Sequence, residues 1–188
     1  MIQYVPGMAL DTIGFHDMDT LRQWRNDPRI IKWTRQNDLI SEDHQMNWYT
    51  RLNGEPKIKM YLIRRMEMES DPIGVCGLTD LDLLNKRAEF SLYIAPQWQR
   101  QGYGKASLKT LLSHGFNAYG LHSIYGESFE GNPAHKLFKE LGLVKTGIDR
   151  EFYWRDGRYI DSHRFQLLRK EWEESEVFSG CRTELCSS

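Results

Sequence analysis

The sequence has few cysteines, no long apolar run and no excess of charge of either sign. Its three cysteines are Cys76, Cys181 and Cys186, and an odd number with two in a polar C-terminal segment gives no disulfide framework. A reducing cytoplasm therefore fits best. A zinc site at the terminal Cys-x4-Cys pair would need a second Cys/His pair nearby, which the sequence lacks, so no metal site is predicted.

Membrane and nucleic-acid partners are not expected. No apolar run approaches the roughly 18 residues that span a bilayer, and the N-terminus lacks the basic-then-apolar layout of a signal peptide. The 25 basic and 26 acidic side chains leave a formal charge of -1, whereas a binder of nucleic acid or anionic membrane needs a net basic face. The 188 residues suit one domain, and no repeat or Pro/Gly/Ser-rich linker divides them. We expect a single domain over residues 1–174 and a flexible tail over 175–188.

Local patterns predict a mixed succession of helices and strands. Capping residues and apolar spacing indicate the helices, whereas alternation and β-rich runs indicate the strands. Helices are predicted over residues 17–24, from Ser41 to Leu52, from Leu108 to Tyr119 and from Asn132 to Gly142. Strands are predicted over residues 59–65, 73–81, 88–95 and 123–125, and two more over 144–168 around an Asp-Gly turn.

The segment after the strand at 88–95 carries the clearest binding signal. It is QRQGYGK at residues 99–105, and its glycines let backbone N–H groups converge on an anion beside the positive end of a helix. A Walker A loop would need glycine at Gln99 and Ser or Thr at Ala106, and a dinucleotide fingerprint would need Gly or Ala at Ser107. A pyrophosphate is the natural ligand; a glycine-rich turn without a ligand is the alternative.

This loop and its surroundings resemble the GNAT superfamily of N-acetyltransferases. Gln99-x-x-Gly102-x-Gly104 is similar to the superfamily's acyl-CoA pyrophosphate loop, and residues 132–142 resemble its Asn-containing helix. The resemblance covers residues 8–172. It implies an α/β (α+β) GNAT fold, with a central mixed, mostly antiparallel sheet of about seven strands flanked by helices. It also implies acetyl-CoA as cofactor, a small-molecule amine as substrate and, through the edge strands, a homodimer.

The resemblance also assigns the coenzyme residues. The pantetheine would lie along the backbone of residues 93–95, with Asn132 near it, and the pyrophosphate on residues 101–105. Many members have a tyrosine at Phe138 that protonates the departing thiolate; phenylalanine cannot, so packing is its expected main role. The predicted cofactor residues are Tyr93, Ile94, Ala95, Gln99, Arg100, Gln101, Gly102, Tyr103, Gly104, Lys105, Asn132 and Phe138.

Acetyl transfer to an amine needs a group that removes a proton, because an alkyl ammonium has a pKa of about 10. Glu89 is the expected base, on the strand before the loop, in a segment similar to Arg-Ala-Glu-Phe of spermidine N-acetyltransferases. The alternative is a surface glutamate paired with Lys86 or Arg87. The oxyanion would be met by a backbone N–H near Ile94, so Glu89 and Ile94 are the catalytic candidates.

The acceptor is left open among several classes. Residues 25–48 resemble acetyltransferases of UDP-linked amino sugars, with aromatic rings for stacking and Arg25, Arg29 or Arg35 for phosphate; these residues could equally be core and solvated surface. That acceptor is favoured over a polyamine, a ribosomal-protein N-terminus and a non-catalytic acyl-CoA-binding role. The predicted substrate residues are Arg25, Trp33, His44, Glu89 and Tyr153, and the acidic residues available for a polyamine are Glu67, Glu69, Asp71, Asp80 and Asp82.

Overall fold

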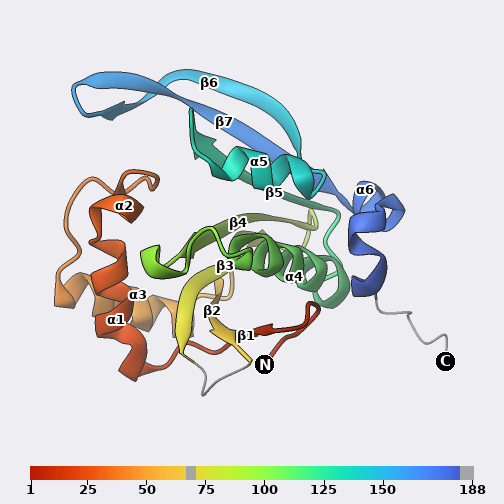
Figure 1. Cartoon of the computed structure of the whole chain (residues 1–188), viewed down its shortest axis with the longest axis horizontal. Coiled ribbons are helices and arrows are strands. Elements are labelled where there is room, and N and C mark those ends of the chain that lie inside the picture. The colour runs from red at the N-terminus through yellow and green to blue at the C-terminus, as the bar shows by residue number, and fades with distance from the viewer. Residues whose placement is uncertain (67–70, 183–188) are drawn as a thin grey trace.

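The fold is an open sheet with helices on both faces. The computed structural model describes residues 1–66 and 71–182, and within this part seven strands form one sheet in the order β1-β2-β3-β4-β5-β7-β6 (Figure 1). β4 and β5 run parallel, and the other neighbouring strands run antiparallel. This confirms the expected mixed, mostly antiparallel sheet. The strands are β1 (Met8–Asp11), β2 (Lys59–Arg65), β3 (Pro72–Asp82), β4 (Arg87–Ile94), β5 (Ser123–Phe129), β6 (Val144–Arg155) and β7 (Arg158–Leu168).

Helix starts follow the capping residues of the sequence. Ser41 Oγ accepts a hydrogen bond from His44 N at 3.2 Å, and Asn132 Oδ1 accepts one from Ala134 N at 2.9 Å. None of the helices in residues 1–66 and 71–182 has both the length and the apolar character needed to cross a bilayer. The helices are α1 (Met18–Arg25), α2 (Pro28–Ile31), α3 (Glu42–Gly54), α4 (Tyr103–Ala118), α5 (Ala134–Glu140) and α6 (Arg169–Glu174), with 3-10 turns η1 (Phe15–Asp17), η2 (Pro96–Trp98) and η3 (Glu176–Cys181).

Apolar side chains pack on both faces of the sheet. On one face α4 lies across β1, β3 and β4 (Figure 1), and Phe90 belongs to the core that it covers. On the other face Leu21 of α1 packs with Leu62 and Val75, and Tyr93 lies against this second cluster. Because successive residues of a strand point to opposite faces, Glu89 shares the Tyr93 face and points away from α4.

The two parallel strands diverge at the centre of the sheet. β4 and β5 pair over three positions, from Arg87 opposite Ser123 to Glu89 opposite Tyr125. β4 then continues beside β3 to Ile94, and β5 continues beside β7 to its end. Beyond Glu89 their facing edges therefore have no strand pairing between them in the described chain. Such an opening leaves backbone groups of β4 available to an extended ligand.

Two early elements differ from the sequence-based expectation. β1 was not predicted, because four residues are too few to show alternation, and its place in the sheet comes from pairing with β2. No helix was predicted directly after the one over residues 17–24, but Asp27 and Pro28 begin α2 there. The Asp27 carboxylate accepts a hydrogen bond from Arg29 N at 2.8 Å, and Pro28 opens α2.

The expectation of a flexible end from residue 175 is wrong for residues 176–182. η3 folds back on the domain, with Phe178 fully buried and Cys181 2% exposed. The carbonyl of Cys181 accepts a hydrogen bond from Asn117 Nδ2 of α4 at 2.9 Å. Because the segment is mostly polar, its large apolar side chain, Phe178, was not predicted to reach the core. Residues 183–188, with Cys186, lie outside the described part.

Replacing Phe178 with alanine is expected to lower the free energy of unfolding by about 3–5 kcal/mol, because it empties a fully buried aromatic site beside Trp172. Urea unfolding monitored by circular dichroism measures the change. Val177→Ala is the matched control, since Val177 lies in the same turn and is 36% exposed. Equal stability of the two variants would show that η3 does not contribute to the core.

Candidate active site

The loop before α4 leaves a row of backbone amides without protein acceptors. In the described part of the chain, the N–H groups of residues 101–104 donate no hydrogen bond to a protein acceptor, whereas those of Lys105 and Ala106 donate to Gly102 O at 3.1 Å. α4 runs for 16 residues, so its positive end adds to the field of these amides. Lys105 is also paired through Nζ with Glu140 at 2.9 Å. The loop therefore offers four free amides to a diphosphate. The backbone N–H of Lys105 was also predicted to bind the diphosphate, but it donates its hydrogen bond to Gly102 O instead.

The backbone of the loop depends on left-handed conformations. Gly102 has φ +87°, with no atom within 4 Å of the position that a Cβ would take, and Arg100 has φ 60°. Gln99 fixes the start of the loop, because its Nε2 donates to Ile94 O at 2.9 Å. The glycine at 102 is thus required by conformation, and the space beside it is open. These features fit a bound acyl-CoA diphosphate.

The other predicted coenzyme residues lie around the opening of the sheet. Ala95 N donates to Ile73 O at 2.8 Å, and the carbonyl of Ile94 is taken by Gln99. Asn132 uses its side-chain oxygen to cap α5. Phe138 is buried, with its ring edge-on to that of Phe90 at 5.2 Å, so the structure places it in the core.

Two carboxylates share one cation on the face opposite α4. Arg35 Nη2 lies 2.9 Å from Glu89 Oε1, and Arg35 Nη1 lies 3.3 Å from Glu127 Oε1. The side chains of Glu89 and Glu127 are 10% and 20% exposed, whereas that of Arg35 is 54% exposed. Glu89 is therefore not a surface glutamate paired with Lys86 or Arg87. Its carboxylate lies where β4 and β5 separate.

The environment of Glu89 suits a proton acceptor. Burial is the largest influence and raises the pKa of Glu89 above that of an ordinary glutamate; Arg35 opposes this shift, and Glu127 and Asp80 add to it. A carboxylate with a raised pKa accepts a proton more readily near neutral pH. These features keep Glu89 as the candidate for the general base.

Side chains from the last hairpin hold Glu127 in position. Tyr153 donates to Glu127 Oε1 at 2.5 Å, and Ser162 Oγ lies 3.1 Å from Glu127 Oε2. Burial and the hydrogen bond to Glu127 raise the pKa of Tyr153 to about 12, so the phenol stays protonated at neutral pH. A cavity of about 420 Å³ adjoins this group, lined by Ile31, Lys32, Asn37 and residues 152–156. Its volume suits a small molecule.

The arginines predicted to bind phosphate already have partners. Arg29 donates to both oxygens of Asp27, at 2.9 and 2.6 Å. Arg25 donates to Gln36 Oε1 at 2.9 Å and lies over the Tyr93 ring at 5.8 Å. Arg35 binds the carboxylate pair. The structure therefore does not gather these three side chains into an anion site.

The remaining substrate candidates are dispersed. Trp33 stacks under Lys32 Nζ at 4.8 Å, and His44 is exposed on the first turn of α3. Of the acidic residues considered for a polyamine, Asp80 raises the pKa of Glu89, and Asp82 accepts a hydrogen bond from the side-chain amide of Asn85. Glu67 and Glu69 lie outside the described residues. Of the predicted substrate residues, the structure therefore brings Glu89 and Tyr153 together around Glu127 and Arg35, and His44 makes none of these contacts.

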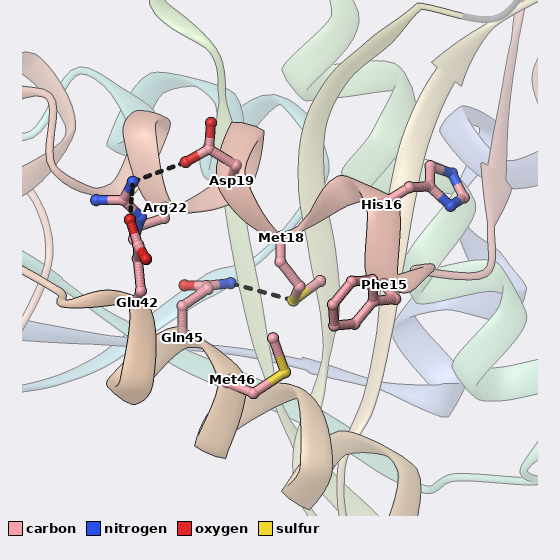
Figure 2. Close-up of a pocket in the computed structure, with 8 residues that line it drawn as sticks. All are labelled: Phe15, His16, Met18, Asp19, Arg22, Glu42, Gln45 and Met46. Atoms are coloured by element: carbon pink, nitrogen blue, oxygen red, sulfur yellow. Dashed lines mark hydrogen bonds and ion pairs between the residues drawn. The ribbon is translucent and has the colours of Figure 1, made fainter.

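A second cavity, of about 380 Å³, lies between η1, α1 and α3 and contains no predicted site residue (Figure 2). Met18, Met46 and Phe15 form its apolar wall, and Gln45 Nε2 points at Met18 Sδ, 3.7 Å away. At its rim Arg22 pairs with Asp19 at 2.7 Å and with Glu42 at 3.4 Å. Arg22 thus bridges the two carboxylates at this rim, and no residue predicted for acetyl transfer lines the cavity.

Sequence reasoning missed Glu127 and the role of Arg35. The strand over residues 123–125 was predicted too short, which left Glu127 outside it; alternation through Tyr125 would have put Glu127 on the Glu89 face. Arg35 lies in irregular chain, 54 residues from Glu89. No local pattern could pair them.

The chain belongs to the acetyltransferase (GNAT) domain family, which matches residues 8–144. It is accordingly an acetyl-CoA-dependent N-acetyltransferase, and the expected family is confirmed. It is 27% identical over 173 residues to the uncharacterized N-acetyltransferase p20 of Bacillus licheniformis, covering 90% of this chain and 97% of that protein. The non-catalytic alternative has no support from these findings.

Two further comparisons involve Vibrio cholerae. The chain is 24% identical over 166 residues to its spermidine N(1)-acetyltransferase, covering 88% of this chain and 95% of that protein. The crystal structure of the V. cholerae spermidine N-acetyltransferase in complex with CoA and spermine superposes with a TM-score of 0.85 at 23% identity, covering 90% of this chain and 99% of that chain. This structure shows that the two proteins share a fold.

Proposed function

We propose that this N-acetyltransferase acetylates a primary amine of a small cationic acceptor of the polyamine type, bound at the Glu89–Glu127 pair. The observation that carries the proposal is that two carboxylates, from the two diverging strands, bind one cation between them. An alkyl ammonium has the same charge as the guanidinium and also donates several hydrogen bonds. The kinship with a protein named spermidine N(1)-acetyltransferase supports the same acceptor class.

Each chemical demand of the reaction has a candidate group in the chain. Bound acetyl-CoA would supply the acetyl thioester. Glu89 would take the proton from the acceptor ammonium, directly or through water, and so generate the neutral nucleophile. A thiol with a pKa of about 8.5 leaves more readily than an amine with a pKa of about 10, so the reaction proceeds without an acid at Phe138. A backbone N–H near Ile94 remains the predicted oxyanion donor.

A nucleotide-linked amino sugar, the acceptor favoured from sequence, has no support from the comparisons. It would bring two phosphates, and each arginine assigned to them is engaged within the protein. Moving an anion toward Glu89 and Glu127 would also be unfavourable. A cationic acceptor avoids both difficulties.

Release of the CoA thiol, followed with a thiol reagent, tests the proposal with spermidine, a UDP-linked amino sugar and a peptide amine. We expect spermidine to give the highest kcat/KM, because its ammonium groups complement the carboxylate pair. Glu127→Gln should raise the KM for spermidine about tenfold, as one charge-assisted hydrogen bond is weakened. A UDP-linked amino sugar as the best substrate would overturn the proposal.

A further inference from the structure

We propose that Arg35 is a specificity-determining residue whose guanidinium occupies the ammonium subsite of the free enzyme and leaves it when a cationic acceptor binds. This inference rests on the proposed function. Arg35 Nη2 lies 2.9 Å from Glu89 and Nη1 lies 3.3 Å from Glu127, each on the Oε1 oxygen. An acceptor ammonium that approaches Glu89 closely enough to lose a proton would need the same oxygen.

The geometry makes Arg35 the movable member of the group. The carboxylates extend from β4 and β5 and are largely buried, whereas Arg35 lies between α2 and α3 in irregular chain and is 54% exposed. Water can solvate the exposed guanidinium once it leaves, and an acceptor ammonium that takes its place keeps the buried carboxylates paired with a cation. A substrate cation can therefore compete with the guanidinium.

The residues on both sides of Arg35 are held by hydrogen bonds, so a rotation of the Arg35 side chain is sufficient. Thr34 O accepts a hydrogen bond from Arg155 Nη2 at 2.8 Å, which ties the segment to the last hairpin. On the other side, Arg25 donates to Gln36 Oε1 at 2.9 Å, and Gln36 Nε2 donates to Asp38 O at 2.7 Å. These bonds fix residues 34 and 36 while leaving the Arg35 side chain free to turn toward solvent. No movement of a whole loop is required.

The charge balance decides which acceptors Arg35 permits. With Arg35 in place, the site of Glu89, Glu127 and Arg35 has one net negative charge; with Arg35 turned out, the pair presents two. A monovalent or anionic acceptor gains little from displacing Arg35, and an anionic one would bind Arg35 itself. A polyamine, which has several ammonium groups, gains most. Arg35 would thus select against acceptors of low positive charge.

Displacement of Arg35 also affects the base. Arg35 lowers the pKa of Glu89, against the larger effect of burial. The other charged or titratable groups acting on Glu89 are Asp80 of β3 and Glu127 of β5, which raise its pKa, while Tyr125 and Tyr153 are coupled to it from β5 and β6. Loss of the guanidinium leaves Glu89 more basic. The acid limb of kcat/KM reports the free enzyme, and that of kcat reports the substrate complex.

Arg35→Met tests the inference, since methionine keeps an unbranched chain without the charge. We expect the KM for spermidine to fall about threefold to tenfold, because the internal competitor is gone. The acid limb of kcat/KM should move to higher pH, while that of kcat stays where it is in the wild type, because Arg35 has already left the wild-type complex. Arg22→Met is the matched control: Arg22 also bridges two carboxylates, Asp19 and Glu42, away from the pair.

Three other results would each overturn a part of this inference. A higher KM for spermidine in Arg35→Met would make Arg35 a binding group for the acceptor. An unchanged KM with unchanged pH profiles, or equal shifts of both profiles, would mean that the guanidinium stays in place during turnover. No turnover of any cationic amine by the wild-type enzyme would overturn the proposed function, and the role of Arg35 with it.

Discussion

Glu89→Gln is expected to lower kcat for acetylation of spermidine about 10²-fold to 10⁴-fold, the usual contribution of a general base. Glutamine keeps the size and the polarity of the side chain but cannot take the proton of the ammonium. Glu127 lies on the same cation and could partly replace it, which favours the lower part of that range. Stopped-flow or steady-state release of CoA thiol measures the effect.

The pH profile identifies the group responsible. Glu89 must be deprotonated to act, so wild-type kcat/KM should rise with pH through the pKa of Glu89, which burial holds above the value of an ordinary glutamate. In Glu89→Gln that limb should disappear. Glu174→Gln serves as control, because the Glu174 side chain is exposed and its ion pair with Lys170 Nζ is a long one, at 3.9 Å. If Glu89→Gln kept the wild-type rate and limb, Glu89 would not be the base.

Gly102→Val is expected to weaken CoA binding at least about 100-fold. Gly102 has φ +87°, which a β-branched residue adopts only with strain, so the loop must change its backbone path. The amides of residues 101–104 then no longer converge. Each hydrogen bond to a charged group contributes about 1.5–3 kcal/mol, so losing two gives this factor or more. Isothermal titration calorimetry measures the dissociation constant.

Two controls separate loop geometry from general damage. Gly120→Val imposes a similar strain at the other end of α4, where φ is +60° and no atom lies within 4 Å of the added Cβ. Pantetheine, which lacks the diphosphate, should bind wild type and Gly102→Val about equally. Equal weakening of CoA binding by both glycine variants, or a loss of pantetheine binding in Gly102→Val alone, would place the diphosphate elsewhere.

Local signals accounted for much of the fold. Asp156 and Gly157 both have positive φ, as the Asp-Gly turn of the last hairpin predicted. Ser41 and Asn132 cap the helices that they were expected to begin. Each of these features depends on interactions within a few residues, which a sequence shows directly. The coenzyme loop could be predicted in the same way, because the positive φ of Gly102 is a local conformation that glycine favours.

Contacts between distant segments could not be predicted in this way. The pair of Glu89 and Glu127 exists because two strands diverge, and Arg35 joins it from irregular chain. The burial of Phe178 likewise depends on where η3 meets the rest of the domain. Reading Arg25 and Arg35 as phosphate ligands failed for this reason: their charge was visible in the sequence, but the partners that they bind in the fold were not. Arg29, in contrast, binds its sequence neighbour Asp27. The arrangement of Glu89, Glu127 and Arg35 depends on tertiary contacts, whereas the conformation of the coenzyme loop depends on residues next to one another in the sequence.

A crystal structure of the chain with CoA and spermidine tests the central claim most directly. It should show a spermidine nitrogen within hydrogen-bond distance of Glu89 and Glu127, with Arg35 turned away and the diphosphate on the amides of residues 101–104. A spermidine bound away from both carboxylates, with the Arg35 ion pairs intact, would contradict the account.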